Sequence, residues 1–169
     1  MYNSIAISNS VGKIMNRLDN TYIFKAKLNN GLARGKTGID TIYDGDTISK
    51  MILDLGFNRY MVSTVRIIGI DTPELRTKSQ TEKAKGYQAR DMLRLLIGNN
   101  DMVFESINAK GTGKYGRALG HIWVCTGADV DDKGKIIGKK WVNAGNELIK
   151  CGLAVEYWGG TKVKDWNED

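Results

Sequence analysis

The sequence has one histidine and two cysteines among its 169 residues, which excludes several kinds of site. A metal centre built from several histidines is impossible, and any Ser-His-Asp or Cys-His scheme has only His121 to use. His121 lies in the alternating segment 119–124, so a half-exposed strand histidine is the simpler interpretation. Cys125 and Cys151 are too few for a disulfide framework or a thiolate zinc site, so we expect two reduced, buried thiols.

Long apolar runs are also missing. No stretch approaches the roughly 18–20 apolar residues of a membrane span, and residues 1–20 lack the charged start and apolar centre of a signal peptide. We therefore expect an intracellular protein with no membrane partner, and secretion by another route is left open. The chain suits one domain, because its length allows one sizeable core and no interdomain linker or internal repeat is visible.

Positive charge is in surplus: the formal net charge is +6 and the sequence pI is about 9.3. Basic surfaces attract polyanions and gain affinity by releasing counterions from phosphates. The alternative is a surface that is charged only for solubility, and charge alone does not separate the two.

Patterns along the chain predict a mainly β fold of the α+β type. Strand-like segments cover residues 21–28, 47–53, 60–70, 102–107 and 118–125. Residues 79–82 match a helix capping box, an apolar stripe follows, and Gly98 ends the helix. A second helix begins at Asn143 or Asn146, and residues 7–18 have helical spacing. About five strands with two or three helices predict a closed five-stranded β-barrel of the oligonucleotide-binding (OB) type.

The most informative stretch is 65–74, in which an apolar strand ends in two acids around the only proline. Pro73 stiffens the turn, so Asp71 and Glu74 are held by a rigid scaffold that water and substrate can reach. Asp46, Asp71 and the carbonyl of Thr72 could supply hard oxygen ligands to calcium or a similar cation. This would form half of a metal-dependent phosphodiesterase site.

Two parts of this pattern also have structural interpretations. The Asp-Gly-Asp segment 44–46 is first of all a hairpin-turn signal. Residues 38–41 repeat the letters of 69–72 but lack the following Pro-Glu, so we expect a loop there.

Two arginines are candidate phosphate-binding groups. A guanidinium offers a planar fork that matches phosphate oxygens and stabilises growing negative charge. Arg66 interrupts an apolar strand, and Arg117 follows a glycine-rich basic loop; a solvated strand arginine and a simple turn are the alternatives. Strict alternation would place Arg66 and Asp71 on opposite faces of one strand. A shared site therefore requires a bulge or strand end near Gly69.

Four motifs, in this order, resemble the staphylococcal nuclease (thermonuclease-like) family over roughly residues 22–158. They are Asp-Gly-Asp-Thr at 44–47, Arg66 with Asp-Thr-Pro-Glu at 71–74, Lys-Tyr-Gly-Arg at 114–117, and the segments 146–148 and 152–154. The chain departs from the family in an insertion at 29–38, in an N-terminal extension, and in the lack of a long C-terminal helix after Trp158. We therefore divide it into an extension (1–20), a nuclease-like OB domain (21–158) and a tail (159–169).

The resemblance implies calcium-dependent hydrolysis of DNA or RNA phosphodiesters, and we expect an endonuclease. Matched by motif, Asp46, Asp71 and the Thr72 carbonyl would bind Ca2+, and Glu74 would orient or deprotonate the attacking water. Arg66 and Arg117 would bind the phosphate and offset its charge. Lys114 and Tyr115 match substrate-contacting positions, and Tyr157 matches another once a one-residue gap is allowed.

Two other readings remain open. OB-folds also bind single strands without cutting them, so a catalytically silent nucleic-acid-binding module is the alternative. A purely structural or protein-interaction barrel explains the charge but not the five charged positions together. We expect a monomer that acts on DNA or RNA.

Overall fold

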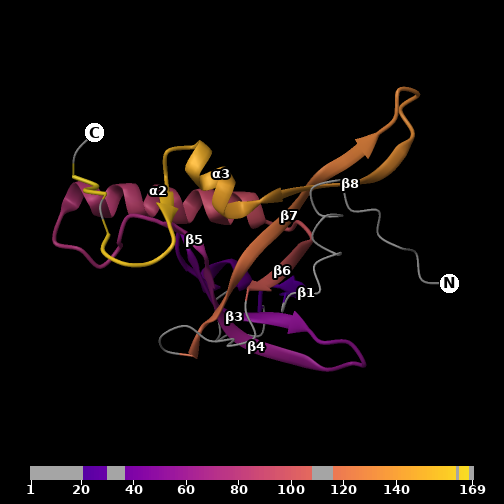
Figure 1. Cartoon of the computed structure of the whole chain (residues 1–169), viewed down its shortest axis with the longest axis horizontal. Coiled ribbons are helices and arrows are strands. Elements are labelled where there is room, and N and C mark those ends of the chain that lie inside the picture. Colours follow the sequence, from indigo (N-terminus) through magenta and orange to yellow (C-terminus); the bar gives the residue numbers. More distant parts are fainter. Residues whose placement is uncertain (1–20, 30–36, 108–115, 163, 168–169) are drawn as a thin grey trace.

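The computed structural model describes residues 21–29, 37–107, 116–162 and 164–167 (Figure 1). The first half contains β1 (Thr21–Lys27), the 3-10 helix η1 (Gly38–Thr41), β2 (Ile42–Asp44), β3 (Thr47–Asp54), β4 (Tyr60–Ile67), β5 (Gly69–Asp71) and α2 (Gln80–Ile97). The second half contains β6 (Met102–Ile107), β7 (Ala118–Val130), β8 (Ile136–Asn143), α3 (Ala144–Lys150) and β9 (Val155–Tyr157).

Five strands close into a barrel. They pair in the order β1-β6-β7-β4-β3, and β3 pairs again with β1, which closes the ring. All of these pairs are antiparallel except β4 with β7, which is parallel. The two helices α2 and α3 lie together on one side of the barrel (Figure 1). The predicted OB-type barrel with packed helices is confirmed.

The core fills the barrel and the space beneath the helices. In β3 the side chains of Met51 and Leu53 are fully buried while the alternate positions are partly exposed, as expected for a strand with one face inside. Leu93 and Ile97 of α2 are also fully buried, so the apolar stripe of this helix is core, as the sequence indicated.

The start of α2 differs from a capping box in one respect. Ser79 Oγ accepts a hydrogen bond from the Glu82 N–H at 3.1 Å, as predicted. The Glu82 carboxylate, however, does not reach back to its own helix start; Oε1 accepts a hydrogen bond from the Glu74 N–H at 3.2 Å. A contact with the turn before the helix thus replaces the local one, and it ties Glu74 to α2.

The structure also tests the predictions for the segment 38–41, the start of α3, the tail and the two cysteines. Residues 38–41 form η1, not a loop, because Asp40 Oδ2 accepts a hydrogen bond from the Thr37 N–H at 2.8 Å. The Asn143 side chain caps α3, and Trp166 is buried and anchors the tail. Both thiols are free, but Cys151 is exposed, so the expectation of two buried thiols was wrong. The predicted helix at 7–18 lies outside the described residues.

His121 lies in β7 and is half-buried, opposite Glu105 of β6. Burial lowers the pKa of His121 below its ordinary value of 6.5, although Glu105 acts in the opposite direction. The unfolded chain therefore binds a proton at His121 at a pH where the folded chain does not. The free energy of unfolding should fall as the pH drops below 6.5 and should level off once the folded form is also protonated.

Urea titrations followed by tryptophan fluorescence at several values between pH 8 and pH 5 test this expectation. The loss of stability on acidification should be smaller in His121→Gln than in the parent protein, because other titrating groups are common to both. Equal losses in the two proteins would show that His121 does not contribute.

Candidate active site

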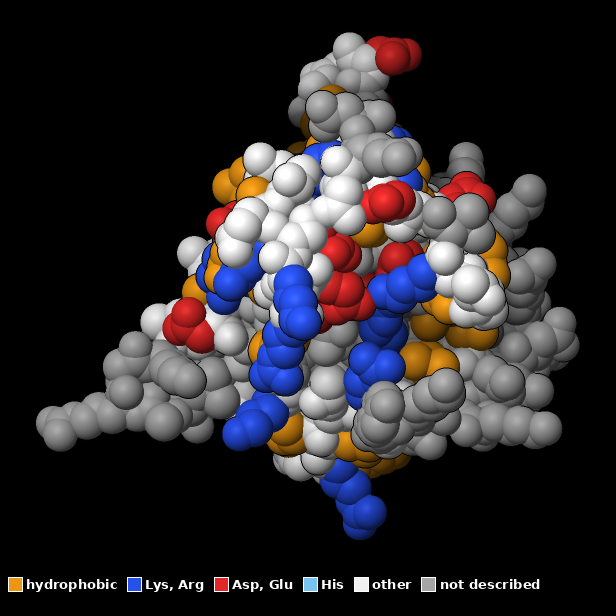
Figure 2. Space-filling model, turned by 90° about the vertical axis from the view of Figure 1, so that its left-hand side faces the viewer, with side chains coloured by type: hydrophobic (Ala, Val, Ile, Leu, Met, Phe, Trp, Pro, Cys, Tyr) orange, Lys and Arg blue, Asp and Glu red, His pale blue; other side chains and the backbone are white. Residues whose placement is uncertain are grey.

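A pocket of about 290 Å³ lies where β5 and β9 meet the end of the barrel. Three acids, three basic residues, two threonines and one tyrosine line it: Asp44, Asp46, Thr47, Arg66, Thr72, Glu74, Arg117, Tyr157 and Lys162. The face shown in Figure 2 has this combination, with Asp and Glu side chains at its centre and Lys and Arg side chains on both sides. The lining contains all of the candidate catalytic residues, Arg66, Glu74 and Arg117.

An interruption between strands β4 and β5 brings the side chains of Arg66 and Asp71 together. β4 ends at Ile67, and β5 begins at Gly69, whose φ of 78° is the left-handed conformation that favours glycine. β5 leaves the barrel and pairs with β9. As a result, Arg66 Nη2 lies 3.9 Å from Asp71 Oδ1 and donates a hydrogen bond to the Ile70 carbonyl at 3.2 Å. The strand end expected near Gly69 is confirmed.

Arg66 also forms an ion pair with Asp46, through Nη1 and Oδ2. Asp46 lies in the turn just before β3, and it is close to Arg66 because the next residue, Thr47, pairs directly with Arg66 of β4. Burial raises the pKa of the Asp46 carboxyl to about 8; the Arg66 guanidinium opposes this shift, and the nearby Asp44 adds to it. The ion-pair geometry favours the carboxylate while burial disfavours it, so a second cation at Asp46 would help to keep it ionised.

Asp71 is the most deeply placed acid of the pocket region. It is 3% exposed, and its Oδ1 faces two cationic groups, Lys162 Nζ at 2.8 Å and Arg66 Nη2 at 3.9 Å. A buried carboxylate oxygen in cationic surroundings suits a hard cation, so the donor set fits calcium.

Such a site would not be complete on side chains alone. Among the described residues, no three His, Cys, Asp or Glu side chains converge closely enough to hold a metal ion. A cation bound by Asp46 and Asp71 would take its remaining oxygen ligands from the Thr72 carbonyl, from water or from a phosphate.

The turn that carries Thr72 and Glu74 is fixed by close packing against α2 and against the turn between β2 and β3. A Cβ at Gly86 of α2 would lie 2.9 Å from the Pro73 carbonyl oxygen, and one at Gly45 would lie 2.9 Å from Thr72 Cγ2. The contact between Glu82 and the Glu74 N–H adds a hydrogen bond to this packing. The Glu74 side chain itself is 55% exposed and faces the pocket.

Lys162 is the residue that the sequence did not predict. Its Nζ lies 2.8 Å from Asp71 Oδ1 and 2.7 Å from Glu74 Oε1, so it bridges a candidate metal ligand and the candidate base. Burial alone would lower the pKa of Lys162, but the hydrogen bonds and charges of these two acids raise it overall. No pattern near Lys162 signals this role, because the contact joins residues 88 positions apart.

Of the four other predicted site residues, two line the pocket and two lie outside the described residues. Arg117 reaches the pocket because β7 runs parallel to β4, with Leu119 opposite Arg66. Tyr157 of β9 also lines the pocket, and its hydroxyl donates a hydrogen bond to the Gly160 carbonyl at 2.7 Å. Lys114 and Tyr115 lie outside the described residues.

Comparison with models of known protein families shows which family this chain is related to. A family model described as "Staphylococcal nuclease homologue" matches residues 64–168, more than half of the sequence. The chain belongs to this family. Membership supports a nuclease-like protein that interacts with nucleic acid. The matched segment includes Arg66, Asp71 and Lys162, whereas Asp46 precedes it and reaches the same pocket from the turn before β3.

Two further findings concern curated relatives and membrane-spanning helices. A search of curated proteins found no match. None of the helices in the described part of the chain is long and apolar enough to cross a membrane.

Proposed function

We propose that the protein is a calcium-dependent nuclease that hydrolyses phosphodiester bonds of DNA or RNA, cutting within the strand. The observation that carries the proposal is the convergence of acids and arginines from separate segments of the chain. Three acids and two arginines line one pocket, and the buried Asp71 lies next to it, close to Arg66 and Lys162. A site that only bound phosphate would gain little from acids beside it, because like charges repel.

Each residue has a part in the proposed reaction. Arg66 and Arg117 bind the phosphate and stabilise the negative charge that grows as water attacks. Glu74 orients that water and accepts its proton. Asp46, Asp71 and the Thr72 carbonyl would hold the calcium ion, which when bound supplies positive charge that polarises the phosphate.

The decisive experiment is a cleavage assay with matched single-stranded DNA and RNA, each carrying a fluorophore and a quencher, in calcium and in chelator. We expect cleavage in calcium alone, and identification of the product ends would assign the broken bond. A folded protein that cuts neither substrate in calcium would contradict the proposal.

A catalytically silent single-strand-binding module is the second candidate, and Lys162 is the observation that favours it. Its ammonium group already neutralises Asp71 and Glu74, as would suit a pocket that needs no metal. Tight, salt-sensitive binding without cleavage in calcium would support this candidate.

Lys162 leads to a prediction about the affinity for cations. Lys162→Met should tighten the binding of Tb3+, a luminescent substitute for calcium, by about fivefold to tenfold. The variant removes a competing positive charge from Asp71 and Glu74, and the partial exposure of Lys162 keeps the effect moderate. Trp158 can sensitise the luminescence, because its ring packs against Gly69 in the strand that carries Asp71.

The matched control is Lys164→Met, whose ammonium lies over the Trp166 ring at 5.7 Å. We expect its Tb3+ affinity to equal that of the parent protein. An unchanged affinity in Lys162→Met would show that Lys162 does not compete, whereas no Tb3+ binding by any of the proteins would contradict the metal site itself.

A further inference from the structure

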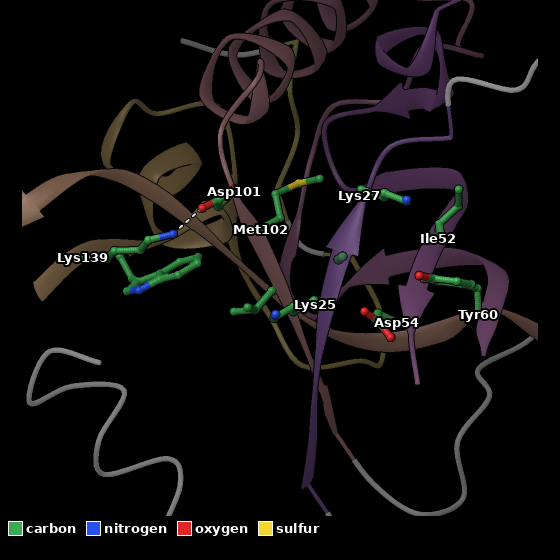
Figure 3. A pocket seen from close by; sticks show the side chains of 11 residues that line it. Lys25, Lys27, Ile52, Asp54, Tyr60, Asp101, Met102 and Lys139 are labelled. Carbon is green, nitrogen blue, oxygen red and sulfur yellow. Dashed lines mark hydrogen bonds and ion pairs between the residues drawn. The ribbon is translucent and has the colours of Figure 1, made fainter. Parts of the chain in front are cut away.

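A second concave site lies away from the active-site pocket, at the other end of β3. It is a groove of about 410 Å³ on the outer surface of the barrel (Figure 3). Strands β1, β3, β4, β6 and β8 contribute its lining: Lys25, Ala26, Lys27, Ile52, Asp54, Tyr60, Asp101, Met102, Val103, Lys139 and Trp141. Thr47 at the start of β3 lines the pocket and Asp54 at its end lines the groove, which separates the two by about 23 Å along the strand.

Aromatic rings stand on both sides of β1 in this groove. Tyr60 is 55% exposed, and Lys27 Nζ lies 5.4 Å from the centre of its ring. Lys139 Nζ lies 6.0 Å from the ring of Trp141. Figure 3 shows Tyr60 and Lys27 on one side of β1 and Lys139 on the other. Each wall of the groove thus combines a flat apolar surface with a positive charge.

The floor of the groove carries two exposed lysines, and Asp54 of β3 lies directly opposite one of them, Lys25. Lys25 and Lys27 are two positions apart in β1 and are both exposed. Their side chains therefore project from the same face of the strand, about 6.6 Å apart. The two acids of the groove have other partners: Asp101 forms an ion pair with Lys139, and Asp54 Oδ1 accepts a hydrogen bond from the Gly56 N–H at 2.8 Å. No ion pair joins either β1 lysine to a carboxylate of the described residues.

We propose that this groove binds a single strand of nucleic acid, with phosphates on Lys25 and Lys27 and bases stacked on Tyr60 and Trp141. Stacking on aromatic rings beside a basic track is how proteins hold single strands without reading their sequence. A duplex keeps its bases paired and stacked, so it could use the lysines but not the rings. An apolar peptide would leave the lysines on the floor without partners.

The strand register ties the lysines of β1 to the wall that carries Tyr60. Tyr60 of β4 pairs with Asp54 of β3, and Asp54 pairs with Lys25 of β1, which also lies opposite Val103 of β6. The inference extends the proposed function by adding a remote contact for the substrate, but binding here does not depend on cleavage.

The test is binding of a fluorescent 12-nucleotide oligothymidine to the full chain in chelator, measured by anisotropy at several salt concentrations. The variants are Lys25→Glu/Lys27→Glu and Tyr60→Ala. The matched control is Lys133→Glu/Lys135→Glu, which makes the same charge change in the turn between β7 and β8. Thermal unfolding confirms that each variant is folded, and Lys25→Gln/Lys27→Gln replaces the first variant if it does not fold.

We expect the β1 variants and Tyr60→Ala to raise the Kd for the single strand about tenfold or more, and the control to change it less than threefold. The slope of log K against log salt should lose about 1.4 in magnitude in the β1 variants, because two phosphate contacts are removed. Tyr60→Ala should leave the binding of a 12-base-pair duplex unchanged. Groove variants that bind the single strand like the control, or a Tyr60→Ala variant that loses duplex and single strand equally, would overturn the inference.

The failure of this inference can be told apart from the failure of the proposed nuclease activity. The binding assay contains chelator, so it reports on the groove whether or not the protein can cut. In calcium, groove variants should still cleave a dinucleotide at the parent rate, since it is too short to span both sites. Reduced dinucleotide cleavage in Lys25→Gln/Lys27→Gln would place these lysines in the catalytic pocket and contradict a separate site.

Discussion

Arg66→Ala is expected to slow phosphodiester cleavage by about 10²- to 10³-fold at saturating calcium, the loss typical of removing one group that stabilises transition-state charge. The guanidinium is held in place: Nη1 donates to the Ile67 carbonyl at 3.2 Å and Nη2 to the Ile70 carbonyl at 3.2 Å. Its orientation relative to the pocket is therefore set before substrate binds, which lowers the entropic cost of positioning the phosphate.

The same variant should destabilise the protein in chelator. Arg66 pairs with the buried Asp46 and lies near the buried Asp71, so its removal leaves two acids with less compensation. Breaking a buried ion pair costs about 3–5 kcal/mol, and the partial exposure of the arginine reduces this to about 2–3 kcal/mol. Urea denaturation would measure the difference.

Arg66→Lys separates the two effects. It keeps the positive charge and should recover most of the stability, but it lacks the planar fork and should recover little of the rate. Arg59→Ala, in the exposed turn between β3 and β4, is the control and should change neither quantity. Single-turnover cleavage by Arg66→Ala within a factor of three of the parent rate would remove Arg66 from the reaction.

The parts of the site that sequence predicted are those with local signals. Pro73 marks a stiff turn, and Gly69 marks the place where the strand had to end for Arg66 and Asp71 to meet. These residues shape the backbone wherever the segment sits in the fold, so their effect can be read without knowing the tertiary structure. The alternation in 119–124 likewise indicated which side chains of β7 point into the barrel.

What escaped prediction depends on contacts between distant segments. The strand β9 has three residues, too few for a pattern, and it exists because β5 leaves the barrel and needs a partner. Glu82 had a local partner available, yet the N–H of Glu74 took its place. Lys162 lies in a tail without periodicity, and its role follows from where that tail returns to the site.

Glu74→Gln is expected to reduce turnover by about 10²- to 10⁴-fold while leaving the binding of DNA in chelator nearly unchanged, the range usual for a lost general base. Glutamine keeps the shape of the side chain and can still orient water, but it cannot accept a proton. The backbone of Glu74 is fixed independently by Glu82 and by the close contact of Gly86 with the turn, so the variant should preserve the pocket. Loss of the ion pair with Lys162 should cost little stability, because both side chains are about half exposed.

This variant also separates the two candidate functions, because a silent module has no turnover to lose. The control is Glu156→Gln, an exposed carboxylate on β9 that does not line the pocket. Single-turnover rates give the sharpest evidence, because they report the chemical step without product release. In Glu74→Gln the rate should fall by the expected factor, because no proton acceptor remains at this position. A rate within a factor of three of the parent would show that Glu74 does not accept the proton and would leave proton acceptance to the solvent.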